Sequence, residues 1–162
     1  MLFRSGSAGV LRGNKLVCVK ETTDSVGSYE LVSGSVRRHT VVAETPLSIL
    51  KINQSVIDNL ISANASYINL FNFLAGAEIS SELLRDVKPY SDYSVKKMRT
   101  VVKSGQIIKL SNDDKQRLAG SRCILVKGKA IADDSEISVS SPAVLDDCNV
   151  RGSGEALLFL LP

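Results

Sequence analysis

The sequence predicts an α+β fold in which two β-rich parts flank a helical segment. Apolar, often β-branched residues alternate with polar ones within residues 15–52, and alternation returns in the last third of the chain. Between them, the apolar residues of 53–75 recur at helical spacing. Aromatic residues make up only 5% of the 162 residues and tryptophan is absent, so we expect a core of Val, Leu and Ile.

The first β-rich part is predicted to span residues 15–52. Its strands are expected at residues 15–21, 38–44 and 47–52. Pro46 separates the last two, because proline cannot donate a hydrogen bond to a sheet. Residues 1–14 are set apart as a non-native or partial start, because MLFRS resembles a read-through scar. The chain is therefore expected to be a fragment of a longer protein.

A helical connector is predicted over residues 53–90. The apolar residues that support the first helix are Val56, Ile57, Leu60, Ile61, Ile68, Phe71 and Leu74. A break is expected near Asn64, and Gly76 is expected to precede a shorter helix over 80–88 that ends before a proline.

The remaining residues, 91–162, are predicted to form a second β-rich lobe. Strands are expected at 96–103, 106–110, 122–132, 136–141 and 156–161. Turns are expected at 112–114 and at Asp133–Asp134, where Asn and Asp residues cluster.

Composition and residue spacing exclude several classes of function. The net charge of +3 is small and spread along the chain, so nucleic-acid binding is not expected. Cys18, Cys123 and Cys148 are scattered, and His39 is the one histidine, so neither a disulfide framework nor a metal site is predicted. No catalytic constellation or cofactor motif is found, and an enzyme is not expected.

One stretch, GSYELVSGSVRRHTVVAET at residues 27–45, indicates a specific kind of pocket. It resembles the second half of a cyclic-nucleotide-binding β-roll, in which a short helix presents its backbone N–H groups to a phosphate. The resemblance implies a partial roll, with Glu30, Arg37 and Arg38 as the candidate ligand-binding residues. Tyr29 stands where close approach would favour glycine, and the spacing from Glu30 to the arginines is short. We therefore expect a vestigial pocket without a bound cyclic nucleotide.

A second resemblance covers residues 16–145. The motif at the start consists of Gly27, Tyr29, Glu30, Leu31, Ser33 and Gly34. It is followed by ILVKGKA at 124–130 and SEISVSSPAVLDD at 135–147. These motifs, in this order, resemble the cytoplasmic region of plant plasma-membrane Na⁺/H⁺ antiporters of the salt-overly-sensitive type.

This second resemblance implies a regulatory segment on the cytoplasmic side of the plasma membrane. Its partners would be the transmembrane antiporter domain of the same chain, a second copy in a homodimer and a regulatory kinase. No transport residue falls within this sequence. The alternatives are a ligand-sensing cyclic-nucleotide-binding domain of a channel, kinase or transcription regulator, and a passive dimerisation scaffold.

Overall fold

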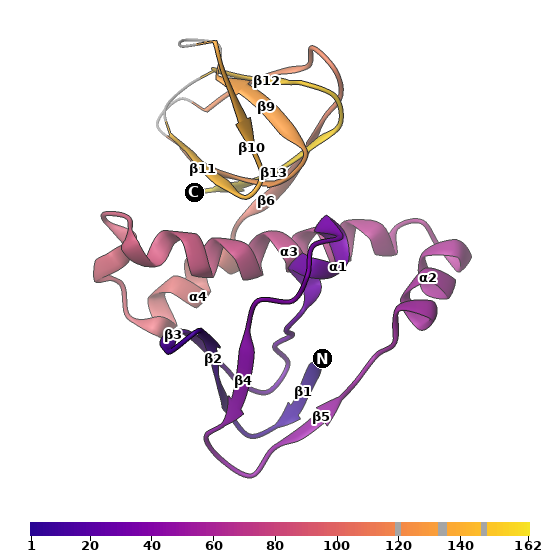
Figure 1. The fold of residues 1–162 in the computed structure, drawn as a ribbon, viewed down its shortest axis with the longest axis vertical. Helices are drawn as coiled ribbons and strands as arrows, with labels where there is room; N and C mark the ends of the chain where they lie inside the picture. The colour runs from indigo at the N-terminus through magenta and orange to yellow at the C-terminus, as the bar shows by residue number, and fades with distance from the viewer. Residues whose placement is uncertain (119–120, 133–135, 147–148) are drawn as a thin grey trace. The chain divides into compact units, whose positions relative to one another are not determined.

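The computed structural model describes residues 1–118, 121–132, 136–146 and 149–162 (Figure 1). They form two compact units, Met1–Glu78 and Ile79–Pro162, called here the first and the second unit. The boundary falls inside the predicted connector. Strands and helices are both abundant and largely separate along the chain, which confirms the predicted α+β class. Among the described residues, no helix has the length and apolar character needed to cross a membrane.

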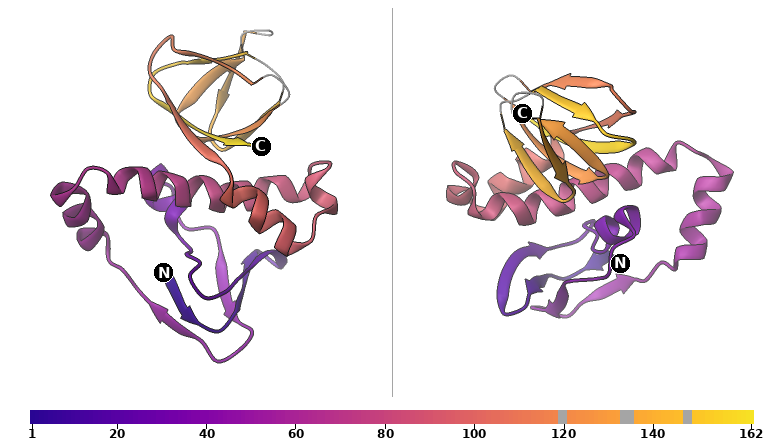
Figure 2. Two further views of the ribbon diagram at one scale, coloured as in Figure 1. Left: turned by 180° about the vertical axis from the view of Figure 1, so that it is seen from behind. Right: turned by 45° about the horizontal axis from the view of Figure 1, so that its top comes forward.

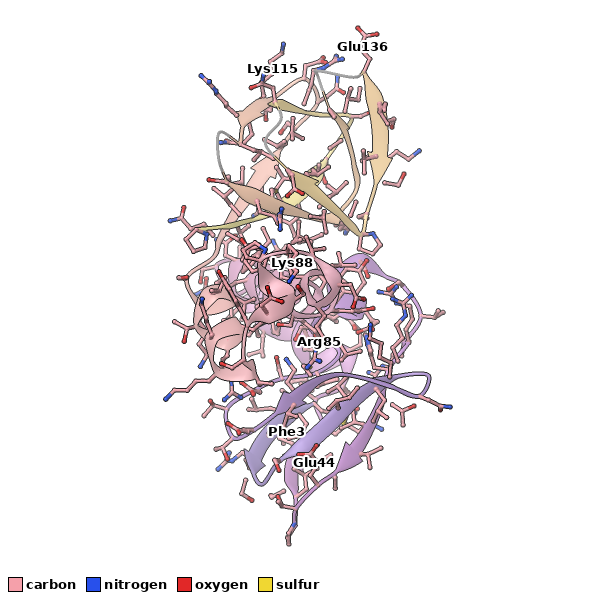
Figure 3. All side chains as sticks on the ribbon, turned by 90° about the vertical axis from the view of Figure 1, so that its left-hand side faces the viewer. Phe3, Glu44, Arg85, Lys88, Lys115 and Glu136 are labelled. Atoms are coloured by element: carbon pink, nitrogen blue, oxygen red, sulfur yellow. The ribbon has the colours of Figure 1, made fainter. Side chains whose placement is uncertain are left out.

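The first unit contains two small antiparallel sheets. Its strands are β1 (Leu2–Ser5), β2 (Ala8–Arg12), β3 (Lys15–Lys20), β4 (Thr40–Ala43) and β5 (Ser48–Leu50). One sheet has the order β3-β2-β4, and the other pairs β1 with β5. The last three strands confirm the predicted ones. Residues 1–14, for which no strand was predicted, form β1 and β2. They contribute Ala8, Val10 and Phe3 to the buried core, and Phe3 is labelled in Figure 3.

The helical region contains α2 (Gln54–Ala63) and α3 (Tyr67–Leu83), separated at Asn64 as predicted. The separate helix predicted over 80–88 is wrong, because α3 continues through Gly76 to Leu83 (Figure 1). Glycine costs a helix interior only about 1 kcal/mol relative to alanine, and packing outweighs this where the residue is buried, as Gly76 is. Two short 3₁₀ turns follow, Leu84–Asp86 and Tyr90–Asp92.

The strand predicted at 96–103 is also wrong, because these residues belong to helix α4 (Val95–Lys103). Met98 and Val102 are four residues apart and both buried, so they lie on one face of the helix. The Ser94 side chain caps this helix by accepting a hydrogen bond from the backbone N–H of Lys97 at 3.2 Å. The β-branched residues of this stretch favoured a strand, and the cap was not recognised.

The second unit contains the remaining strands of the described chain. They are β6 (Gln106–Leu110), β7 (Lys115–Arg117), β8 (Arg122–Lys127), β9 (Lys129–Ala132), β10 (Ile137–Ser140), β11 (Ala143–Asp146), β12 (Asn149–Gly152) and β13 (Ala156–Leu161). The predicted strands at 106–110, 136–141 and 156–161 are confirmed. The single strand predicted over 122–132 is divided at Gly128 into β8 and β9. The turn predicted at Asp133–Asp134 lies outside the described residues.

These strands form two antiparallel sheets (Figure 2). The buried apolar side chains of this unit form one core cluster. The strand orders of the sheets are β11-β8-β13-β6 and β10-β9-β12-β7. If β6 is counted as strand one and β13 as strand eight, the strand orders of the two sheets become 6-3-8-1 and 5-4-7-2. This is the arrangement of a double-sheet jelly roll. Leu125, Leu158 and Val150 are completely buried in its core.

The first unit repeats part of this topology. The pairing of β1 with β5 matches that of β8 with β13, and the pairs β2–β3 and β2–β4 match β9–β10 and β9–β12. An isolated bridge between Leu2 and Ser25 matches the pairing of β8 with β11. The first unit therefore has six of the eight positions of the roll, with Ser25 at the sixth.

A glycine marks the same corner in both units. Gly6 follows β1 with a φ of 83°, and Gly128 follows β8 with a φ of 87°. A Cβ at Gly6 would collide with the backbone oxygen of Pro46, which precedes β5. A Cβ at Gly128 would collide with the backbone oxygen of Glu155, which precedes β13. The equivalence of the two units therefore extends to the local packing of their corners.

Candidate functional site

The candidate site lies in the first unit, between the sixth and seventh positions of its roll. The connection there contains the short helix α1 (Ser28–Ser33). Gly27 precedes the helix with a φ of 91°, a conformation that non-glycine residues rarely adopt. Gly34 follows it in a left-handed conformation, and its N–H donates to the Glu30 carbonyl at 2.9 Å. The GSYELVSG motif thus encodes a helix of six residues with a glycine at each end.

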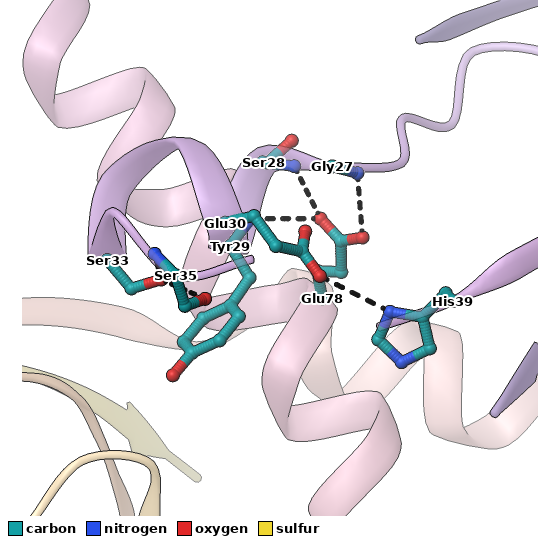
Figure 4. A network of polar contacts seen from close by, with 8 residues as sticks. All are labelled: Gly27, Ser28, Tyr29, Glu30, Ser33, Ser35, His39 and Glu78. Atoms are coloured by element: carbon teal, nitrogen blue, oxygen red, sulfur yellow. Dashed lines mark hydrogen bonds and ion pairs between the residues drawn. The ribbon is translucent and has the colours of Figure 1, made fainter. Parts of the chain in front are cut away.

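A carboxylate of the chain itself occupies the amino end of α1 (Figure 4). The N–H groups of Gly27, Ser28 and Tyr29 donate to the Glu78 carboxylate at 2.9, 2.7 and 3.1 Å. Charge-assisted bonds of this kind are stronger than neutral ones. Glu78 therefore satisfies the backbone groups that the sequence resemblance assigned to a phosphate.

Glu30 is buried beside His39. Its Oε1 lies 3.4 Å from His39 Nδ1, and both side chains are more than nine-tenths buried (Figure 4). Oε1 makes no hydrogen bond among the described residues, so the contact is an ion pair when His39 is protonated. The structure thus pairs Glu30 with a histidine to which no role was assigned.

The two arginines of the motif differ in burial. Arg37 is exposed, whereas Arg38 is half-buried with its guanidinium carbon 5.4 Å from the centre of the Tyr29 ring. Nε and Nη2 of Arg38 are buried and have no hydrogen-bond partner among the described residues. Two neighbouring guanidinium N–H groups can bind an anion with two oxygens. Arg38 therefore has two buried N–H groups that are available to an anion.

The terminal ammonium of Met1 also lies near this region, and groups in it affect the pKa of the ammonium. It donates to the Val26 carbonyl oxygen at 2.7 Å. Burial lowers the pKa of this ammonium, Arg37 acts in the same direction, and Glu78 opposes them. Both positive and negative charges therefore lie near the amino end of α1.

In the part of the chain that the structure describes, His, Cys, Asp and Glu side chains form no cluster of three that could hold an ion. Cys18 is half-buried and Cys123 is buried. The third cysteine, Cys148, lies outside the described residues.

Sequence reasoning missed Glu78, whose carboxylate accepts three backbone hydrogen bonds at this site. Glu78 is far from the motif along the chain, and it was included only as part of the helical connector. One signal was present, because no charged residue occurs between Asp58 and Glu78. A lone carboxylate at the end of a long uncharged stretch of helix points to a specific partner.

Comparisons with known proteins give a likeness of structure only. No family model matches the chain, and no curated protein sequence matches it. Similar solved structures include a regulatory subunit of a cAMP-independent protein kinase A from Trypanosoma brucei, with 14% identity and a TM-score of 0.39. The regulatory domain of Toxoplasma gondii protein kinase A with cAMP has 13% identity and a TM-score of 0.40. The C-linker and cyclic-nucleotide-binding homology domain of zELK channels has 9% identity and a TM-score of 0.37.

The extent of these matches differs. The alignments cover 99% of this chain for the two kinase subunits and 66% for the channel domain. They cover 62%, 69% and 88% of the respective solved chains. The structural neighbours are thus cyclic-nucleotide-binding and homologous regulatory domains. At these identities and TM-scores, the likeness carries no argument about what this chain binds.

Proposed function

We propose that the chain is a regulatory segment of a membrane Na⁺/H⁺ antiporter, on the cytoplasmic side of the plasma membrane. The order of the three motifs in the sequence supports this. The motif at 124–130 covers the β8–β9 corner, and the described part of the motif at 135–147 covers β10 and β11. The motifs therefore coincide with defined elements of the two units.

The observation that carries the regulatory proposal is the Glu78 contact. The three N–H groups at the start of α1 are engaged by a carboxylate of the same unit. An external phosphate would have to displace this negative charge before reaching them. In this proposal the segment is not an enzyme, and α1 ties the roll to α3 instead of holding a cyclic nucleotide.

Regulation would then act through changes of packing. The proposed partners are the transmembrane domain of the same protein, a second copy in a homodimer and a kinase. A signal can change transport only if the two functional states differ in contacts with this segment. The α1–α3 connection is our candidate for such a contact.

Titration calorimetry with cAMP and cGMP tests the site. We expect no heat of binding at micromolar nucleotide for the unaltered chain. Micromolar binding by the unaltered chain would contradict the proposal. Sequencing the complete coding region tests the antiporter context, which requires several apolar spans of about 20 residues. A kinase domain or a helix-turn-helix in their place would refute it.

A ligand-sensing domain is the second candidate, because Nε and Nη2 of Arg38 are buried without a hydrogen-bond partner. Such a fork suits the two oxygens of a phosphate or carboxylate. If this candidate holds, cAMP or cGMP binds, and Arg38→Lys weakens binding at least about tenfold by removing the fork. Arg37→Lys is the matched control, and it should leave the affinity unchanged because Arg37 is exposed.

A further inference from the structure

Helix α4 of the second unit is strongly basic (Figure 1). Its nine residues, VKKMRTVVK, include four basic side chains and no acidic one. No acidic residue occurs anywhere between Asp92 and Asp113. The other 16 of the 20 basic residues of the chain are balanced by its 17 acidic residues. The small positive charge of the whole chain therefore arises from this one helix.

The basic residues of α4 lie on its exposed side. Met98 and Val102 are buried, whereas Lys96, Lys97 and Lys103 are exposed. Because a helix has 3.6 residues per turn, the three lysines lie on the side of α4 that faces away from Met98 and Val102. The apolar side of the helix is thus used within the second unit, and the basic side faces outward.

The charges of these lysines are not compensated. Lys96, Lys97 and Lys103 form no ion pair with any of the described residues. The acidic residue that precedes the helix, Asp92, accepts hydrogen bonds from the Lys88 ammonium at 2.7 and 2.6 Å through its two oxygens. The Lys97 ammonium lies 3.6 Å from the centre of the Tyr93 ring, which orients its charge without neutralising it.

We infer that the exposed side of α4 is a docking surface for a lipid bilayer that contains anionic lipid. A lysine ammonium is a hydrated point charge on a flexible stem, which suits an array of headgroup phosphates and carboxylates. Because Met98 and Val102 are buried within the unit, charge provides the attraction and no apolar face of α4 enters the bilayer. The inference goes beyond the proposed function and does not depend on the α1 site.

Other anionic or protein partners fit this surface less well. A stable protein interface buries about 800 Å² on each partner around apolar or aromatic side chains. Val95, at 46%, is the large apolar side chain of α4 that is exposed. A single small anion needs donors that converge, but Lys96 and Lys103 are separated by about 10 Å along the helix axis. An extended anionic surface therefore matches α4 best.

The test measures binding of the complete chain to vesicles of equal parts phosphatidylserine and phosphatidylcholine by sedimentation. We expect binding to these vesicles and none to vesicles of phosphatidylcholine alone. Raising the salt concentration from about 0.1 M to about 1 M should release the chain, because the screening length falls from about 10 Å to about 3 Å. Amide hydrogen exchange should show that the anionic vesicles protect residues 95–103.

Two pairs of lysine substitutions locate the surface. Lys96→Gln with Lys103→Gln should weaken binding to the anionic vesicles at least about tenfold. Arginine at the same two positions keeps the charge, so it should preserve the binding. Lys127→Gln with Lys129→Gln is the matched control, because it removes two exposed lysines from the same unit outside α4. This control should change the affinity less than about threefold. Circular dichroism checks that every variant keeps its helices.

Several outcomes would overturn the inference. These are no binding to the anionic vesicles, equal binding to phosphatidylcholine alone, or binding that persists at high salt. Equal losses for the two glutamine pairs would show that only the net charge matters. Protection of α4 by the soluble headgroup glycerophosphoserine, to the same extent as by vesicles, would indicate a site for a single anion instead. None of these outcomes bears on nucleotide binding at α1 or on the sequencing test, so a failure here is distinguishable from a failure of the proposed function.

Discussion

The two units share one pairing scheme but differ in what is inserted into it. In the second unit, only residues 147 and 148 separate β11 from β12. In the first unit, the equivalent connection runs from Ser25 to β4 and contains α1, Glu30 and His39. The candidate site is therefore a local addition to a repeated scaffold, and each unit acts as a control for the other.

The units also differ in what stabilises them. The second unit is built around a continuous apolar core between its two sheets. The first unit has a smaller core of Phe3, Ala8, Val10 and Val26, and a polar network joins its roll to a helix. Apolar burial scales with area, whereas the polar network depends on a few specific atoms. Substitutions should therefore affect the two units through different mechanisms.

The largest effect is expected from Phe159→Ala in the second unit. The Phe159 side chain is completely buried, and its ring fills the space next to Gly105. Its removal should lower the free energy of unfolding of this unit by about 3–5 kcal/mol. Urea unfolding, monitored by amide hydrogen exchange, measures the loss in the free energy of unfolding for each unit. Ile137→Ala, at a 59% exposed position, should cost far less, and equal losses would contradict the assignment of the core.

Glu78→Ala should have the next largest effect, and it should be confined to the first unit. The substitution leaves the three N–H groups at Gly27, Ser28 and Tyr29 without their charged partner. We expect a loss of about 3 kcal/mol in the free energy of unfolding and faster exchange of these amides. Glu44→Ala, at an exposed position (Figure 3), is the control. Unchanged exchange at residues 27–29 would show that Glu78 does not hold α1.

The paired substitutions Gly6→Ala and Gly128→Ala test the equivalence of the units directly. Each places a Cβ against a backbone oxygen at positive φ, so each should cost about 2 kcal/mol in its own unit. Gly13 and Gly154 also have positive φ but have open space around them. Alanine at either of these should cost only about 1 kcal/mol. Thermal unfolding compares the stability of the four variants. A large difference between the stability losses of Gly6→Ala and Gly128→Ala would contradict the equivalence of the two units.

The smallest effect is expected for Ser94→Ala, which lies outside both rolls. It removes the hydrogen bond from the Lys97 N–H and should destabilise α4 by about 1 kcal/mol. Ser94→Asp should restore the cap. Circular dichroism during thermal unfolding measures both variants. If the two behaved alike, the capping role would be excluded.

Local sequence patterns predicted the secondary structure correctly where the residues of a segment determine its own conformation. Alternation along KLVCVK and QIIKL predicted β3 and β6, and helical spacing predicted α2 and its end at Asn64. These patterns arise because a strand alternates its faces at every residue and a helix turns every 3.6 residues. The motif of Glu30 directed attention to the segment that forms α1.

Local patterns failed where packing decides. The stretch VKKMRTVVK has β-branched residues and was predicted as a strand, but burial of Met98 and Val102 on one face makes it a helix. Gly76 was expected to end a helix that continues through it. Residues 1–14 were set apart from the fold, although Phe3 is a core residue. In each case contacts with distant residues outweighed a local preference of about 1 kcal/mol.

The sequence by itself determined the α+β class, the strands β3 and β6 and the end of α2 at Asn64. Only the tertiary structure brought Glu78 to α1, paired Glu30 with His39 and distinguished the half-buried Arg38 from the exposed Arg37. The internal repeat also became visible only in the strand pairing. The physical reason is that periodicity records which face of a segment is buried, whereas partners some fifty residues apart are selected by the packing of the folded chain.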